Sequence, residues 1–295
     1  MEGYMADQPS IYKSPEYQDR LMAIYDSKLE QWPVPYESVF VDTAFGKVHV
    51  IISGPQDAPP ALLLHATGMA AWSWLYNLES LIHHYRTYAI DHIGEPGKSE
   101  LNDLNHYPRD PQELSDLCQE ICVNLGVQSS VVIGASNGGF LSMNYAYHNP
   151  DRVQKMVLLG PMGVSQPKLS TAIRMGVVSI FPMNSLLVST SRWAIGDDPG
   201  VQEKCGDWFT TLMRGTIPKV AFPQFISPEQ KQSIKVPVLV FLGSRDNVVG
   251  DHDKARENAQ NFPDVEIAVL ESGHLIGVEH AETVNKRILE FLTST

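Results

Sequence analysis

The chain has 295 residues, of which 43% are hydrophobic and 19% are charged. This composition excludes a disordered chain, which needs low hydrophobicity and high charge, and the length permits one large domain with a substantial core. The formal net charge of −12 disfavours nucleic acid and anionic lipid as partners, because both are themselves negatively charged.

The N-terminal 36 residues are predicted to be a polar, partly helical lead-in without the apolar stretch of a secretory signal. No apolar run in the chain reaches the roughly 18 to 20 residues that span a bilayer. Cys118, Cys122 and Cys205 are an odd number of thiols, which argues against a disulfide framework and for a reducing compartment. We therefore expect a cytoplasmic protein with no membrane span.

Residues 37–54 are predicted to form two antiparallel strands at a sheet edge, because Val48, Val50 and Ile52 alternate along the segment and Gly46 suits the turn. From residue 60 onward, short continuous apolar runs are typical of strands that are covered on both faces. These runs are 61–64, 88–90, 131–133, 156–159 and 238–242. Helical segments separate most of them, so the sequence predicts crossover units and a parallel sheet.

The segment 110–126 carries the strongest helix signals. Asp110 suits the N-cap, and Glu113 completes a capping box. The apolar stripe of this helix includes Cys118 and Cys122, so we expect both thiols to lie in the core.

Residues 162–234 interrupt the alternation, since they are rich in Met, Phe and Trp, contain no clear strand and favour helix. We interpret this segment as a helical cap over one end of the sheet, inserted into a core formed by 1–161 and 235–295. The predicted fold class is α/β, with a mostly parallel sheet and helices on both faces. The core pattern resumes with a helix at 251–262, a strand at 265–270 and a last helix near 279–293.

The sharpest motif is the Gly-x-Ser-x-Gly segment 134–138, which lies between a predicted strand and a predicted helix. This setting is that of a nucleophile elbow, in which a strained turn lifts the serine hydroxyl clear of the sheet. The flanking glycines allow the strand and the helix to approach without a Cβ clash. We expect Ser136 to be the nucleophile.

A serine nucleophile needs a base, and the base needs an orienting acid. His274 and Asp246 each follow a predicted strand, so both lie at the same edge of the parallel sheet as Ser136. Asp251 and Asp253 lie close to Asp246 but are better suited to open the following helix. The chain order of nucleophile, acid and base is the one expected after a strand–helix elbow.

The oxyanion of a tetrahedral intermediate also needs preorganised donors. We expect one to be the backbone N–H of Asn137, the residue after the nucleophile. The other is assigned to the backbone N–H of Thr67, in the loop after the first parallel strand.

Other motifs point to neither a cofactor nor a metal. The segment 97–99 (Gly-Lys-Ser) lacks the earlier glycine of a phosphate-binding loop, and no Gly-x-Gly-x-x-Gly is present. The segments 83–84 and 251–253 contain His and Asp without the spacing of metal ligands.

From about residue 37 to 293 the chain resembles the α/β-hydrolase superfamily. Beyond the elbow and the triad, the resemblance rests on the segment 65–67 (His-Ala-Thr) followed by Trp74, on the turn 91–99 and on the segment 148–153. The opening segment 31–54 and the style of the cap are most similar to bacterial carboxylesterases that act on esters of aryl-propionic acids such as naproxen. The resemblance implies the α/β-hydrolase fold and hydrolysis of carboxylic esters.

Two positions depart from the family pattern. Ala66 stands where the family has glycine after the oxyanion histidine, which leaves Gly68 or Met69 as alternative second donors. The turn after the next strand carries Glu95-Pro96, so we transfer no pocket role to it.

These observations predict a serine hydrolase of small to medium, aryl-containing carboxylic esters, with a small-molecule ester as its partner and no cofactor. The fold hosts many chemistries, so a hydrolase of lactones, amides or carbon–carbon bonds and a non-catalytic small-molecule receptor stay open as alternatives. The natural substrate and the oligomeric state stay open as well. The cap is expected to supply an apolar pocket from Met175, Phe181, Met183, Trp193, Trp208, Phe209 and Met213.

Overall fold

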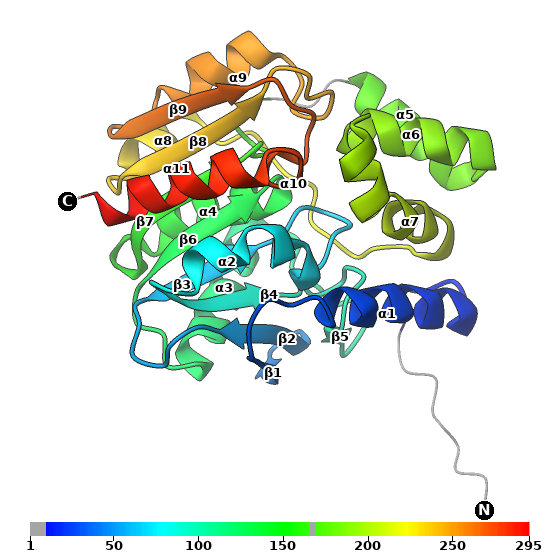
Figure 1. The fold of residues 1–295 in the computed structure, drawn as a ribbon, viewed down its shortest axis with the longest axis horizontal. Coiled ribbons are helices and arrows are strands. Elements are labelled where there is room, and N and C mark those ends of the chain that lie inside the picture. The colour runs from blue at the N-terminus through cyan, green and yellow to red at the C-terminus, as the bar shows by residue number, and fades with distance from the viewer. Residues whose placement is uncertain (1–9, 166–168, 295) are drawn as a thin grey trace, which may run out of the picture.

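A central β-sheet organises the molecule, which a computed structural model describes for residues 10–165 and 169–294 (Figure 1). Along the sheet the strand order is β1-β2-β4-β3-β6-β7-β8-β9, and β5 pairs with β2. The strands are β1 (Tyr36–Thr43), β2 (Gly46–Ser53), β3 (Pro60–Leu64), β4 (Arg86–Ile90), β5 (Glu100–Leu101), β6 (Ser130–Ala135), β7 (Val153–Leu159), β8 (Val238–Gly243) and β9 (Val265–Leu270).

The sheet is parallel from β4 through β3, β6, β7 and β8 to β9. β1 and β2 are antiparallel to each other, and β2 is antiparallel to β4. The predicted edge pair and the predicted parallel sheet are therefore both confirmed. The carboxyl ends of the parallel strands meet at one edge, which is where ligand sites of such sheets form.

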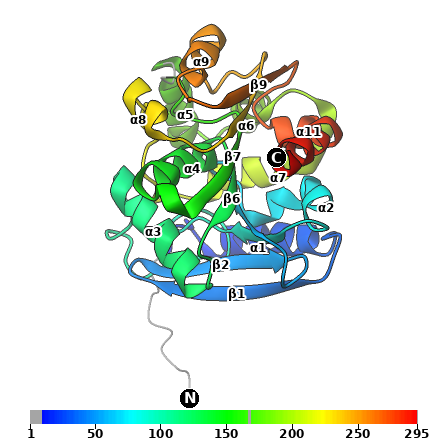
Figure 2. The ribbon, with the colours of Figure 1, turned by 90° about the vertical axis from the view of Figure 1, so that its left-hand side faces the viewer.

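Helices cover both faces of the sheet. Figure 2 shows α3, α4 and α8 on one side, with α2 and α11 on the other. The helices are α1 (Pro15–Leu29), η1 (Ala71–Tyr76), α2 (Leu78–Leu81), α3 (Pro111–Asn124), α4 (Asn137–His148), η2 (Pro150–Arg152), α5 (Leu169–Ile180), α6 (Asn184–Ile195), α7 (Pro199–Gly215), α8 (Pro228–Ser233), α9 (His252–Ala259), α10 (Ile276–Glu279) and α11 (Ala281–Thr293).

The hydrophobic core lies in two layers, one on each side of the sheet. In β6, for example, Val131 and Ile133 join one layer, while Val132 between them joins the other. Side chains of a strand alternate between faces, so a strand covered on both sides needs apolar residues at successive positions. This is the physical reason for the continuous apolar runs in the sequence.

The helix α3 forms as its start signals predict. The Asp110 side chain accepts from the backbone N–H of Glu113 at 2.9 Å, and the Glu113 carboxylate accepts from the backbone N–H of Arg109 at 2.8 Å. Cys118 and Cys122 are buried in the core beneath this helix, as predicted, and burial raises the pKa of both thiols.

The segment 162–234 contributes α5, α6, α7 and α8, with residues 166–168 outside the described part of the chain. Figure 1 shows α5, α6 and α7 grouped at one end of the sheet, and α7 packs against α1 and α10. The division into a core and a cap stays a prediction. Within 10–165 and 169–294, no helix is long and apolar enough to cross a membrane.

Candidate active site

Ser136 stands at the sharp turn between β6 and α4. Its backbone has φ 52° and ψ −113°, and within the described residues it is the only non-glycine residue with positive φ. A Cβ on Gly134 would lie 2.3 Å from the carbonyl oxygen of Gly138, and a Cβ on Gly138 would lie 1.9 Å from that of Leu64. The strained turn expected of a nucleophile elbow is therefore present, and both glycines are required by close backbone approach.

The structure brings the three predicted triad residues together from separate loops. His274 Nε2 lies 2.7 Å from Ser136 Oγ, and His274 Nδ1 lies 2.7 Å from Asp246 Oδ2. All three side chains are buried, with exposed fractions of 6% for Ser136, 8% for His274 and 1% for Asp246. This chain of contacts has the geometry with which a histidine can take the proton of a serine hydroxyl.

Asp246 is held in its ionised form by its surroundings. Burial opposes the charge, but His274 and the backbone N–H groups of Val248 and Val249 outweigh it and hold the pKa of Asp246 below its usual value. The two backbone bonds, at 2.8 and 3.1 Å, both go to Oδ1 and leave Oδ2 for the imidazole. Asp251, the neighbouring acid, caps α9 through the backbone N–H of Lys254, as predicted.

The hydrogen bonds of the oxyanion loop, residues 65–69, distinguish the candidate donors from one another. The backbone N–H of Gly68 donates to Glu95 Oε2, and that of Met69 donates to the Ala66 carbonyl at 2.9 Å. The backbone N–H of Thr67 has no protein acceptor among the described residues, and neither does that of Asn137. Of the three loop positions that the sequence left open, only Thr67 has an N–H that is free to bind an oxyanion.

Comparison with known proteins agrees with this geometry. A family model described as the α/β-hydrolase fold matches residues 59–187. The Bacillus subtilis protein named uncharacterized carboxylesterase nap is 29% identical to this chain over 95% of each sequence. The structure of naproxen esterase from B. subtilis superposes with a TM-score of 0.84 at 26% identity, covering 95% of this chain and 100% of that one.

The chain has the α/β-hydrolase fold. The structure of carboxylesterase CesB (YbfK) from B. subtilis is similarly close, with a TM-score of 0.83 at 27% identity over 94% of this chain and 99% of that one. The predicted fold class and the predicted resemblance to bacterial carboxylesterases are thus confirmed.

An apolar pocket opens beside Ser136. Ser136 and His274 lie in its wall, together with Met69, Trp74, Leu159, Leu275 and Val278. These residues come from the sheet side of the molecule, and among the described residues none of the lining belongs to 162–234.

The predicted lining of the pocket by the cap is therefore corrected. Phe181 and Met183 point into solvent, with exposed fractions of 60% and 65%. Trp208 and Phe209 are buried, but they pack in the core cluster, and Trp193 and Met213 lie against the same cluster. Met175 is half-buried on α5 and is absent from the pocket wall. The helices of this segment use their large apolar side chains to pack against the core. The segment's content of Met and Trp therefore reflects core packing and not a substrate pocket.

Three residues whose roles in the site the sequence did not predict hold it in place. Glu279 accepts from the backbone N–H of Gly273 at 2.8 Å and pairs with Arg245 at 2.8 Å, so it ties the His274 loop to the Asp246 loop. Glu95 and Trp208 hold the oxyanion loop from two sides. Glu95 accepts from the N–H of Gly68, and Trp208 Nε1 donates to the carbonyl of Gly68 at 2.6 Å. Of these three roles, only that of Glu95 was hinted at by the sequence, because this residue departs from the family pattern.

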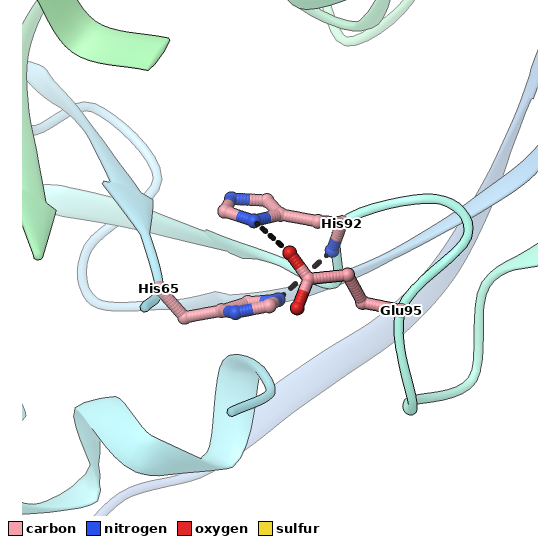
Figure 3. A group of neighbouring side chains, drawn as sticks. All are labelled: His65, His92 and Glu95. Carbon is pink, nitrogen blue, oxygen red and sulfur yellow. Dashed lines mark hydrogen bonds and ion pairs between the residues drawn. The ribbon is translucent and has the colours of Figure 1, made fainter. Parts of the chain in front are cut away.

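His65, His92 and Glu95 form the one compact group of metal-ligand residue types among the described residues (Figure 3). Both nitrogens of His65 are occupied, because Nε2 accepts from the backbone N–H of His92 at 3.0 Å and Nδ1 donates to the Ala66 carbonyl at 2.8 Å. Burial lowers the pKa of His65 to about 4, in keeping with this neutral form. Two free ligands are fewer than the three protein ligands of a catalytic zinc site.

Proposed function

We propose that this α/β hydrolase is a serine carboxylesterase that cleaves small to medium carboxylic esters, with aryl-containing esters preferred. The observation that carries the proposal is the chain of 2.7 Å contacts from Ser136 through His274 to Asp246, set on an elbow with positive φ. The carboxylesterase names of the B. subtilis relatives support the reaction class, and the name of naproxen esterase supports the aryl preference.

In the proposed mechanism, Ser136 Oγ attacks the acyl carbon while His274 Nε2 takes its proton. Asp246 fixes the tautomer of His274 and stabilises the imidazolium that forms. The backbone N–H groups of Thr67 and Asn137 bind the oxyanion of the tetrahedral intermediate. The intermediate collapses to an acyl-enzyme as His274 protonates the leaving alcohol. Water, deprotonated by His274, then attacks the acyl carbon, so that the acid is released and Ser136 regains its proton.

The apolar pocket beside Ser136 is the proposed binding place for the acyl or alcohol group. Trp74, Leu159 and Met69 offer an aromatic and aliphatic wall to a ring-sized substituent. Each methylene that such a wall accepts or rejects is worth about 1 to 3 kcal/mol in discrimination between substrates. We infer that this wall favours compact esters over long lipid chains.

The experiment is a comparison of kcat/KM for p-nitrophenyl acetate, butyrate, octanoate and palmitate and for a naphthyl-propionate ester. We expect the aryl-propionate and butyrate to lead and palmitate to be last. Ser136→Ala is expected to lower kcat by a factor on the order of 10⁴ to 10⁶. Ser129→Ala, just before the opposite end of the strand that carries the nucleophile, is the matched control and is expected to keep full activity.

Two outcomes would contradict the proposal. Folded wild-type protein that turns over none of these esters favours the receptor alternative. A Ser136→Ala variant that keeps more than about a tenth of the activity removes Ser136 as the nucleophile.

A further inference from the structure

A second pocket lies behind the oxyanion loop, between α3 and the turn that follows β4. Its wall is built from β2, β3, β4, α3 and α4, which place apolar side chains opposite a polar group. The segment 219–221 forms part of its wall, and the backbone N–H of Lys219 bonds the Gly94 carbonyl at 2.8 Å. This cavity, which we call the Glu95 pocket, shares no lining residue with the pocket beside Ser136.

One wall of the Glu95 pocket presents three buried polar side chains with unsatisfied atoms. His92, Glu95 and Asn137 are exposed by only 9%, 1% and 5%. Both ring nitrogens of His92, Oε1 of Glu95 and Oδ1 of Asn137 have no hydrogen-bond partner among the described residues. His92 Nδ1 lies 3.6 Å from Glu95 Oε1, and the other ring nitrogen of His92 points away from Glu95 (Figure 3).

Unsatisfied polar atoms in such a group call for a ligand. The large majority of buried polar side-chain atoms in proteins have a partner, so four unsatisfied atoms on three side chains that line one pocket indicate a place for a bound molecule. Water alone could bond these atoms, but it would make no apolar contact with the hydrophobic side of the pocket. That side is formed by Leu114, Leu117, Cys118, Ile121 and Leu141.

The protonation of the polar wall defines the chemistry of the ligand. Burial lowers the pKa of His92 to about 4, so its ring is neutral near pH 7 and offers one donor and one acceptor. Burial also raises the pKa of Glu95, in spite of the bond from Gly68. An anionic ligand would bury its charge beside the neutral ring of His92 and the carboxyl group of Glu95, so anions are disfavoured. A hydroxyl group, which both donates and accepts, matches these atoms.

We propose that the Glu95 pocket binds a small neutral molecule that carries one hydroxyl group on an apolar, ring-sized body, that is, an alcohol or a phenol. The hydroxyl lies against His92, Glu95 and Asn137, and the body lies against α3. Glu95 and Asn137 also adjoin the oxyanion loop, but this pocket shares no lining residue with the pocket beside Ser136, and the proposal does not depend on the proposed function.

The test is calorimetric titration of the full-length protein with 4-methylphenol, with p-xylene as the isosteric partner without a hydroxyl and with 4-methylbenzoate as the anion. We expect saturable binding of 4-methylphenol, at least about tenfold tighter than that of either analogue, because one net hydrogen bond approaches a factor of ten. His92→Phe keeps the ring and removes both nitrogens, and it is expected to bring 4-methylphenol and p-xylene to within about twofold.

Two tryptophan variants of α3 keep the test decisive if His92→Phe fails to fold. Leu114→Trp fills the half-buried apolar wall and is expected to weaken 4-methylphenol binding at least tenfold. Val123→Trp places the same side chain on the exposed face of the helix and is expected to leave binding unchanged.

Crystals soaked with 4-bromophenol then locate the ligand through the anomalous signal of bromine. Bromine between His92 and Leu117 supports the proposal. The proposal is overturned by the absence of saturable binding in solution, by equal affinity for 4-methylphenol and p-xylene, or by bromine beside Ser136 alone. Loss of binding in Val123→Trp to the same extent as in Leu114→Trp overturns it as well.

Discussion

Replacing Asp246 by asparagine tests how His274 is oriented, with almost no change of shape. In the native site Asp246 Oδ2 accepts from His274 Nδ1, so the lone pair of Nε2 faces the hydroxyl of Ser136. The carbonyl of an asparagine keeps the two backbone bonds that Oδ1 receives from Val248 and Val249. Its NH₂ group then points at His274 Nδ1 and imposes the opposite tautomer, in which Nε2 carries the proton and cannot act as a base.

The expected loss follows from this change of tautomer. The same substitution in serine proteases lowers kcat by about 10⁴, which corresponds to about 5 kcal/mol of transition-state stabilisation. The free energy of unfolding should change by only about 1 to 2 kcal/mol, since one charge-assisted hydrogen bond is exchanged for a weaker one. Activity should therefore fall far more than stability.

The assay is kcat for p-nitrophenyl butyrate, with urea unfolding of each variant in parallel. Asp251→Asn is the matched control, because asparagine keeps the oxygen that caps α9 at Lys254. We expect this control to retain full activity. The reasoning is refuted if Asp246→Asn keeps more than about a tenth of the native kcat, or if Asp251→Asn loses as much activity as Asp246→Asn.

Three further predictions concern the surroundings of the site. Trp208→Phe removes the hydrogen bond to the Gly68 carbonyl. Because one hydrogen bond is worth about 1 kcal/mol, kcat/KM for p-nitrophenyl butyrate should fall about three- to tenfold. An unchanged kcat/KM would show that this bond does not position the oxyanion loop. Burial lowers the pKa of His92 to about 4, so the unfolded chain takes up the proton first as pH falls, and the unfolding free energy should drop between about pH 6.5 and 4, by up to about 3 kcal/mol. Urea melts of His92→Phe should lack this part of the pH dependence, and an identical slope in both proteins would contradict it. Cys118, Cys122 and Cys205 are buried, and burial raises the pKa of each thiol. Ellman's reagent should therefore label no thiol in the native protein and three in urea. Fast labelling of the native protein would refute their burial.

The elements that could be predicted from the sequence are those set by local patterns. The elbow at Ser136 follows from two glycines, a serine, and the strand and helix on either side of them. His274 and Asp246 could be placed at one edge of the sheet because the carboxyl ends of parallel strands meet there. For these residues, local sequence patterns and the geometry of a parallel sheet are enough to predict that the side chains lie together.

The positions that escaped prediction depend on contacts between distant segments. Trp208 lies 140 positions from Gly68, and no periodicity or spacing connects the two. Glu279 was expected only as the start of a helix, but its carboxylate holds the loop of His274. Phe181 and Met183 have the apolar side chains expected in a pocket, but they lie between α5 and α6, and only the folded structure shows that they face solvent.

The central claim is that Ser136 is a nucleophile that forms a covalent acyl-enzyme, and an active-site phosphonate tests it most directly. Intact protein is incubated with a p-nitrophenyl alkylphosphonate and analysed by mass spectrometry, with peptide mapping of the adduct. We predict one adduct per chain, located on Ser136, with loss of ester hydrolysis in the same proportion and no adduct in Ser136→Ala. An unlabelled Ser136 in folded, active protein, or an adduct on another residue that accounts for the loss of activity, would contradict the account.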